Sequence, residues 1–190
     1  MLPLHGHDAH WPWITAAGVL LALGLLLAGC AGRPLADAPR TVAAVDLPRY
    51  LGTWYEIARL PNRFQDGGGR ACEQVTATYT ARPDGRITVL NRCDDAGRQR
   101  VAAGQAYVVE GSGGARLRVS FFWPFYGDYW VLGLDPDYRW AVVGDPDRKY
   151  LWILSRRPAM APADYAAAVG IARAQGFAVE ALRPTRQDGA

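Results

Sequence analysis

The chain has 190 residues, of which 50% are hydrophobic and 21% are charged, and this composition is typical of a globular domain and excludes a disordered or fibrous chain. One domain is expected at this length. The formal net charge is only +3 and no run of five or more basic residues occurs, so nucleic acid is not indicated as a partner. Only three histidines and three cysteines are present, which limits acid–base, metal and thiol chemistry.

The N-terminal part has the pattern of a secretion signal. Residues 14–28 form an uncharged apolar run, shorter than the about 20 residues that span a membrane but typical of a signal-peptide core. The run ends in Leu-Ala-Gly-Cys, which resembles the bacterial lipobox and implies that residues 1–29 are cleaved and that Cys30 is lipidated. No Lys or Arg precedes Cys30, which departs from the usual positive start. The alternative is a buried apolar helix that ends in an incidental cysteine.

Such processing would decide both the location and the chemistry of the mature protein. An Asp directly after the lipidated cysteine would resemble the signal that retains lipoproteins in the inner membrane, but Ala31 stands at this position. The resemblance therefore implies a periplasm-facing protein anchored by lipid to the cell outer membrane. Two or more acyl chains anchor a protein stably, whereas one alone binds weakly. Cleavage removes His5, His7 and His10, so no imidazole remains for acid–base catalysis or metal binding. We therefore predict no metal and no cofactor.

Beyond the signal, the pattern changes to that of a β domain. Residues 30–45 contain proline and small residues without a clear period, and predict a lipidated N-terminus and tether. A domain is expected over residues 46–183, with a tail over residues 184–190. Segments rich in β-branched and aromatic residues alternate with turn signals about every ten residues. They predict eight strands, at residues 52–60, 72–80, 86–93, 101–109, 115–122, 128–134, 138–144 and 149–155.

Short connections constrain how these strands are arranged. Links such as residues 83–85 and 135–137 are too short for a parallel crossover, which needs a dozen or more residues. The strands must run antiparallel, and an eight-stranded meander avoids open edges by closing into a barrel. Residues 162–175 are Ala-rich with a proline in the first turn, and predict one helix after the barrel. Residues 177–182 predict a short last strand.

Three motifs in chain order resemble those of the lipocalin family. Gly52 and Trp54 form a G-x-W motif, residues 144–153 resemble the second family motif, and Arg156 belongs to the third. The stretch over residues 46–183 is similar to the bacterial outer-membrane lipoproteins of this family. The resemblance implies an all-β fold, an eight-stranded antiparallel up-and-down lipocalin barrel with one C-terminal α-helix.

The family fold implies a structural role for these motif residues. Gly52 lets the chain enter the first strand closely packed, and Trp54 plugs the closed end of the barrel. Arg156 then lies over the indole, a cation–π contact worth about 0.5–2 kcal/mol. Arg157 is the alternative partner, and an ordinary core Trp with a surface Arg is the other interpretation.

Cys72 and Cys93 lie on the two strands joined by the turn at residues 83–85. A three-residue turn would place residue 93 opposite about residue 75, and it would send the two thiols to different faces of the sheet. A disulfide therefore requires a further bulge, or a bend at residues 70–72. The alternative is two free buried thiols, although an oxidising compartment favours the bond.

An eight-stranded barrel can be filled by side chains or can hold one small ligand. Aromatic rings with a polar tip suit an amphipathic guest, and such residues are abundant in the predicted strands. If Trp54 points inward, Glu56 does too, as a contact for a ligand head group or an internal arginine; exposure of Glu56 to solvent is the alternative. Most of these aromatic residues could equally pack outside the barrel under the helix, and about half of them are expected to line the cavity. The predicted ligand-binding residues are Glu56, Tyr79, Tyr107, Phe121, Trp130, Trp140, Tyr150 and Trp152.

Residues 121–127, Phe-Phe-Trp-Pro-Phe-Tyr-Gly, place aromatic side chains around a turn where polar residues are normal. The stretch resembles the equivalent one in bacterial lipocalins. One interpretation is a lipophilic lip that contacts the membrane, a ligand tail or a second subunit of a homodimer. The other interpretation is packing over the end of the barrel.

The resemblance implies a lipid-binding outer-membrane lipoprotein and not an enzyme. Its ligands would be fatty acids or lysophospholipids, stored or transported for membrane biogenesis or maintenance. Burial of an acyl chain at about 0.8 kcal/mol per CH₂ gives affinity without recognition of charge. Two alternatives remain. One is a thiol-dependent enzyme with an unpaired Cys72 or Cys93, and the other is a structural envelope protein with a filled barrel.

Overall fold

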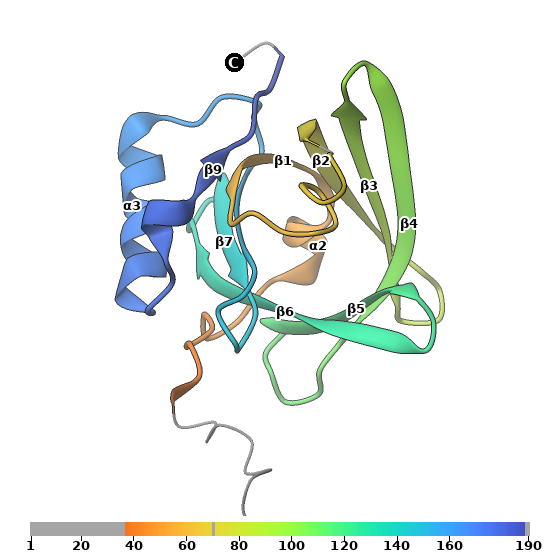
Figure 1. Ribbon diagram of the computed structural model, residues 1–190. Coiled ribbons are helices and arrows are strands. Elements are labelled where there is room, and N and C mark those ends of the chain that lie inside the picture. Colours follow the sequence, from red (N-terminus) through yellow and green to blue (C-terminus); the bar gives the residue numbers. More distant parts are fainter. Residues whose placement is uncertain (1–36, 70, 189–190) are drawn as a thin grey trace, which may run out of the picture. The chain divides into compact units, whose positions relative to one another are not determined.

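Antiparallel strands run around a closed barrel, and each is hydrogen-bonded to the next along the chain (Figure 1). The barrel closes at the first strand, which pairs with both the second and the eighth. The predicted all-β up-and-down barrel is therefore confirmed. The strands of the barrel are β1 (Gly52–Arg59), β2 (Cys72–Ala81), β3 (Ile87–Asp95), β4 (Arg98–Val108), β5 (Arg116–Phe122), β6 (Phe125–Leu134), β7 (Trp140–Gly144) and β8 (Leu151–Ser155).

The computed structural model describes residues 37–69 and 71–188, and the described residues from 38 onward group into one compact unit. The predictions for the secretion signal, for Cys30 and for the start of the tether lie outside the described residues. Among the residues described, no helix is both long and apolar enough to cross a membrane.

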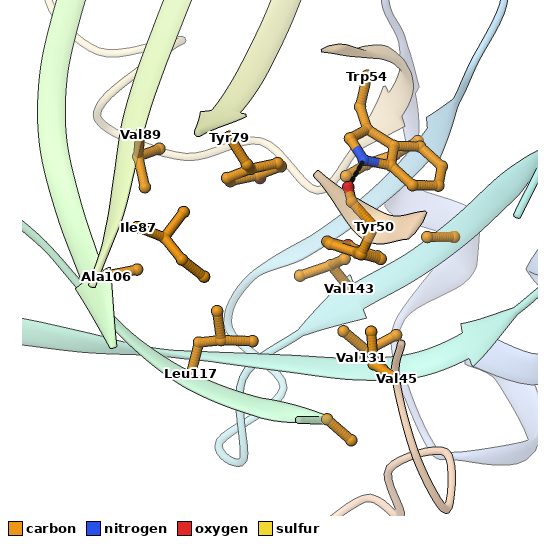
Figure 2. Close-up of a cluster of buried hydrophobic side chains, with 13 residues drawn as sticks. Val45, Tyr50, Trp54, Tyr79, Ile87, Val89, Ala106, Leu117, Val131 and Val143 are labelled. Atoms are coloured by element: carbon orange, nitrogen blue, oxygen red, sulfur yellow. Dashed lines mark hydrogen bonds between the residues drawn. The ribbon is translucent and has the colours of Figure 1, made fainter. Parts of the chain in front are cut away.

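One end of the barrel is closed by the short helix α2 (Leu47–Tyr50), which precedes β1 and lies within the ring of strands in Figure 1. Tyr50 is 3% exposed and belongs to the cluster of buried side chains inside the barrel, called the interior cluster (Figure 2). We call the opposite end, which carries the turns β1–β2, β3–β4, β5–β6 and β7–β8, the open end. The interior cluster consists of Val45, Tyr50, Trp54, Tyr79, Ile87, Val89, Ala106, Ala115, Leu117, Val131, Ala141, Val143 and Leu154.

Helix α3 (Pro162–Ala174) packs on the outside of the barrel against β6, β7 and β8 (Figure 1). The buried faces of Ala168 and Ala172 let the helix approach the sheet closely. This second layer, called the outer cluster, consists of Ala58, Leu60, Trp130, Leu132, Trp140, Val142, Leu151, Ile153, Ala168, Ala172, Phe177 and Val179. Residues of β6 and β7 therefore alternate between the interior and the outer cluster, as the period of a strand requires.

The structure differs from the predicted strand over residues 177–182. The chain forms a short 3₁₀ helix, η3 (Val179–Ala181), followed by a two-residue strand, β9 (Arg183–Pro184). Phe177 and Val179 are both buried in the outer cluster. The spacing of these two apolar residues resembles that of a strand, but here both pack an irregular segment against α3 and the sheet.

The C-terminal residues 183–187, called the C-terminal strap, belong to the barrel. Along one edge of β1, β2 pairs over the first half and β9 pairs over the second half. The strap bridges both strands, because the Thr185 N–H donates to the Ile57 carbonyl at 2.9 Å and the Gln74 N–H donates to the Arg186 carbonyl at 2.7 Å. The strap thus fills the seam between β1 and β2, and the predicted tail over residues 184–190 is part of the domain as far as residue 187.

The N-terminal boundary also differs from the prediction, because residues 38–45 lie along the barrel. The Val42 N–H donates to the Val131 carbonyl at 2.9 Å, and the Val45 N–H donates to the Gly113 carbonyl at 2.8 Å. The Val45 side chain is buried in the interior cluster. The predicted tether is therefore docked on the barrel from residue 38 onward.

The β2–β3 hairpin contains the bulge that a disulfide was expected to require. Thr76 pairs with Arg92, whereas Cys72 pairs with Asp95, so the register shifts within β2. The shift brings Cys72 to the same face as Cys93, and the two form a disulfide with their Cα atoms 5.4 Å apart.

Candidate functional site

A bulge in β1 turns a second charged side chain, Arg59, into the barrel beside Glu56. The pairing of β1 with β8 shifts between Glu56 and Ala58, so that Ile57 is an extra residue in the strand. Trp54 and Glu56 face inward before the bulge, Ala58 packs in the outer cluster behind it, and Arg59 faces inward again. Glu56 is 3% exposed and Arg59 is 0% exposed, so both charges are removed from water.

The buried Arg59 guanidinium is held by two carboxylates and a hydroxyl. Nη1 donates to Glu56 Oε1 at 2.7 Å and to Thr185 Oγ1 at 2.9 Å. Nε and Nη2 donate to the two oxygens of Asp66 at 3.0 and 2.6 Å. Burial alone would lower the pKa of Arg59, but the hydrogen bonds to Asp66 and Glu56 outweigh burial and raise it. The cation is fully matched, so its charge is not left free for a ligand.

The same cluster of charges ties the C-terminal strap to the barrel. Arg183 donates to Asp66 through Nη1 and to Glu73 through Nη2, the latter at 2.6 Å. Burial would raise the pKa of Asp66, yet hydrogen bonds from Arg59 and from the Asn62 N–H lower it to about 2. With Glu56, the cluster holds three carboxylates against two guanidinium groups. Its excess charge is negative, which disfavours the approach of a ligand carboxylate.

An aromatic stack leads from this cluster toward the open end. Gln65 donates from Nε2 to Glu56 Oε2 at 2.7 Å and accepts from Trp152 Nε1 at 3.0 Å. Tyr150 stacks on Trp152 with ring centroids 5.8 Å apart, and Phe64 stacks on Tyr150 at 5.9 Å. The structure thus brings three predicted residues, Glu56, Tyr150 and Trp152, to one side of the open end.

Three tyrosine hydroxyls meet in the closed half of the barrel. The Tyr129 oxygen lies 2.7 Å from the Tyr50 oxygen and 2.9 Å from the Tyr79 oxygen. Figure 2 shows Tyr50 beside Trp54, and Tyr79 near the aliphatic side chains of Ile87 and Val89. Burial raises the pKa of Tyr79 to about 12 and raises the pKa values of Tyr50 and Tyr129 as well. All three hydroxyls therefore stay protonated at neutral pH and act as hydrogen-bond donors.

The inner face of β4 is built from small residues. Ala102, Gly104 and Ala106 are every second residue of the strand, so they lie on one face of it. This is the inner face, because Ala106 belongs to the interior cluster. A Cβ atom at Gly104 would lie 2.8 Å from the Phe121 ring, so this predicted residue lies over the glycine on the inside. Ala102, one position closer to the open end, is exposed although it faces inward. Side chains therefore do not fill the open half at this level.

The structure places three of the predicted ligand-binding residues away from the interior. Trp130 and Trp140 are buried in the outer cluster, where α3 covers them. Tyr107 is 40% exposed on the outer face and packs edge-on against Tyr126 at 5.3 Å. The physical reason is strand alternation: Ala106, Val131 and Ala141, which adjoin these three residues, face inward.

Four polar residues of the interior were not predicted from the sequence. Arg59 and Gln65 were missed because the bulge in β1 and the fold of the β1–β2 turn have no sequence signal. Tyr50 was missed because it precedes the first strand. Tyr129 could have been found, because it stands two residues before Val131 on the same face of β6.

A hollow of about 510 Å³ lies outside the barrel, near the end that α2 closes. It is lined by residues 41–43, residues 109–113 and Arg116. No predicted ligand-binding residue lines this hollow. Within the residues that the structure describes, no group of three or more His, Cys, Asp or Glu side chains could hold a metal ion.

The fold and the closed end identify the family. Residues 45–187 match the lipocalin-like domain. The chain belongs to the lipocalin family. At the closed end of this lipocalin, Gly52 has a φ of +92°, and a Cβ there would lie 3.4 Å from Nη1 of Arg156. Trp54 Nε1 donates to the Tyr50 carbonyl at 2.8 Å (Figure 2), and the arginine over its indole is Arg156, whereas Arg157 is exposed.

Relatives of this lipocalin include bacterial and plant proteins. The outer membrane lipoprotein Blc of Citrobacter freundii is 45% identical over 157 residues, which are 80% of this chain and 86% of that protein. Temperature-induced lipocalin-1 of Arabidopsis thaliana is 42% identical over 154 residues, 77% of this chain and 81% of that protein. Among solved structures, insecticyanin from the tobacco hornworm Manduca sexta has a TM-score of 0.65 at 18% identity, covering 80% of this chain and 85% of that one. The structural likeness shows the fold alone.

Proposed function

We propose that this lipocalin binds a fatty acid or a lysophospholipid in its barrel and stores or transports it for the biogenesis or maintenance of a bacterial outer membrane. The observation that carries the proposal is the inner face of β4, where small residues leave the inward-facing Ala102 exposed. Apolar side chains surround the deeper interior, so an acyl chain entering from the open end would lose its contact with water. The proposed lining comprises Glu56, Tyr79, Phe121, Tyr150 and Trp152, together with Ala102 and Tyr129.

The proposed location is the outer membrane, with the protein facing the periplasm and anchored through acylated Cys30. The name of the relatives, outer membrane lipoprotein, supports this location. Labelling cells with a palmitate analogue tests it, because a Cys30→Ala variant should lose the label while a Cys93→Ala variant should keep it. Label retained by the Cys30→Ala variant would contradict the anchor.

The turn between β5 and β6 supports contact with lipid at the open end. Phe122, Trp123 and Phe125 are 81%, 78% and 77% exposed, which is unusual for rings of this size. Phe64 is exposed on the β1–β2 turn at the same end. We propose that these rings contact the membrane or the tail of an entering lipid. A homodimer through the same rings is the alternative, and light scattering of the purified protein distinguishes the two.

A thiol-dependent enzyme is disfavoured because Cys72 and Cys93 are joined by a disulfide and are both buried. We propose that the protein is a carrier and not an enzyme. Titration of the oxidised protein, without its acyl anchor, should detect no free thiol at these two positions. One reactive thiol at either position would revive the enzymatic alternative.

Lipid binding itself is tested on the purified protein without the acyl anchor. Native mass spectrometry should find fatty acid or lysophospholipid bound after purification from cells, and a fluorescent fatty acid should bind and be displaced by palmitate. The rival of a filled, structural barrel predicts neither result. A protein that carries no lipid and rejects the fluorescent probe would overturn the proposed function.

A further inference from the structure

The hydroxyl groups of Tyr50, Tyr79 and Tyr129, called the trio, can donate more hydrogen bonds than they form with one another. Three hydroxyls bring three O–H donors, but only two oxygen–oxygen contacts join them, both to Tyr129. Whichever way the protons point, one O–H donor of the trio is left over, and lone pairs also remain free. A buried hydroxyl without a partner is unfavourable, so the spare donor favours a polar group beside the trio.

The trio faces the interior and is reached through Tyr129. Tyr50 and Tyr79 are 3% and 7% exposed, whereas Tyr129 is only partly buried. Tyr129 shares the inner face of β6 with Val131, which is 0% exposed, so the accessible surface of Tyr129 borders the inside of the barrel. Leu117, opposite Tyr129 on β5, is apolar and buried. The spare donor therefore lies at the deep end of the barrel, where its neighbours are apolar side chains of the interior cluster.

The charged cluster around Arg59 cannot supply a partner for a polar group beside the trio. Arg59 is fully matched by Glu56 and Asp66, and that cluster has an excess of negative charge. At the closed end, both terminal nitrogens of Arg156 are directed at backbone carbonyls, at 2.9 and 2.6 Å. An ionised group beside the trio would thus be buried without a free counter-ion, which is costly.

We propose that the hydroxyls of Tyr50, Tyr129 and Tyr79 form a polar subsite at the deep end of the barrel, which takes a neutral hydrogen-bonding group, a carbonyl or hydroxyl, on the buried end of an apolar ligand. The proposal rests on the proposed function, because it assumes that an apolar ligand enters the barrel. It adds a selectivity that burial of an acyl chain alone would lack, since plain hydrocarbon leaves the spare donor unpaired.

The test compares ligands of one length that differ only in a neutral polar group. Dodecane, 1-dodecanol and 2-dodecanone are used to displace a bound fluorescent fatty acid, from the wild type and from a Tyr50→Phe, Tyr79→Phe, Tyr129→Phe triple variant. The triple variant removes the whole trio and leaves no orphaned hydroxyl. We expect it to bind the ketone and the alcohol about tenfold more weakly than the wild type, with the affinity for dodecane unchanged or raised. Tyr107→Phe, on the outer face, is the matched control and should change none of these affinities.

A second measurement keeps the proposal testable if the triple variant does not fold, which near-ultraviolet circular dichroism would show. The infrared band of 2-dodecanone labelled with ¹³C at its carbonyl should move to lower frequency in the wild-type barrel than in hexane, because the carbonyl accepts a hydrogen bond. A band at its hexane position, or a folded triple variant that binds all three ligands as the wild type does, would overturn the subsite. Failure of every ligand, including the fluorescent fatty acid, would instead overturn lipid binding itself.

Discussion

The guanidinium carbon of Arg156 lies 3.9 Å from the centre of the Trp54 ring, over the face of the indole. Its Nη1 donates to the Thr53 carbonyl at 2.9 Å and its Nη2 donates to the Arg49 carbonyl at 2.6 Å. One side chain just past the end of β8 therefore holds α2 and the start of β1 together. The closed end of the barrel depends on this contact.

Replacing Arg156 with Gln should destabilise the protein by about 1–3 kcal/mol, because the cation–π contact and two charge-assisted hydrogen bonds are lost. Urea unfolding, followed by tryptophan fluorescence, measures the change. Arg157→Gln is the matched control, since the neighbouring side chain is exposed, and it should cost less than about 0.5 kcal/mol. Equal effects of the two substitutions would contradict the role assigned to Arg156.

The lowered pKa of Asp66 predicts how stability responds to acid. Its folded-state pKa is about 2 against an ordinary value of 3.8, so its stabilising contribution is present above about pH 4 and is lost as the pH falls through 2. We expect Asp66→Asn to lower the free energy of unfolding at pH 6, and the difference from the wild type to shrink by about 1 kcal/mol by pH 2; solvent screening keeps this below the full shift. Asp147→Asn, which breaks an exposed pair with Lys149, should show no such trend.

The disulfide between Cys72 and Cys93 closes a loop with a sequence separation of 21 residues. A Cys72→Ser, Cys93→Ser double variant should be less stable by about 3 kcal/mol, chiefly because its unfolded chain is less constrained. Chemical unfolding with and without a reductant measures this, and reductant should destabilise the wild type and leave the double variant unchanged. A wild type indifferent to reductant would show that the bond contributes nothing.

The exposure of Ala102 on the inner face of β4 predicts how the barrel can be blocked. Ala102→Phe places a ring inside the open half, and we expect it to weaken binding of a fluorescent fatty acid at least tenfold while the protein remains folded. Ala103→Phe adds the same ring to the outer face of the same strand, where it pairs with Leu90, and should leave binding unchanged. If both variants bind as the wild type does, the ligand lies elsewhere on the molecule.

The strands and the helix α3 could be predicted because each depends on local pattern, and the closed end was predicted from the resemblance to lipocalins. Alternating β-branched and aromatic residues favour strands, and short links force antiparallel neighbours, so the barrel follows from connectivity. The motif residues Gly52, Trp54 and Arg156 stand at fixed places in that pattern. The need for a bulge before Cys72 and Cys93 can form a disulfide could also be predicted from nearby residues, because the turn at residues 83–85 sets the register of the hairpin.

The interior was less predictable because a bulge in β1 resets which residues face inward. Period-two alternation from Trp54 correctly places Glu56 inside, but beyond Ile57 it assigns Arg59 to the outer face, where the structure has it inside. The assignment of Trp130 and Trp140 to the cavity failed for a different reason. Aromatic residues suit both faces of a strand covered by a helix, and composition does not choose between them.

The sequence by itself determined an antiparallel barrel and its strand order, since these follow from short-range pattern and connectivity, and its resemblance to lipocalins indicated the residues of the closed end. Only the tertiary structure decided what lines the barrel. The docking of residues 38–45, the C-terminal strap in the seam between β1 and β2, the matched charges around Arg59 and the tyrosine trio all join residues that are distant in the chain. Such contacts depend on register, bulges and the path of irregular segments, which are set by packing in three dimensions and leave no periodic trace in the sequence.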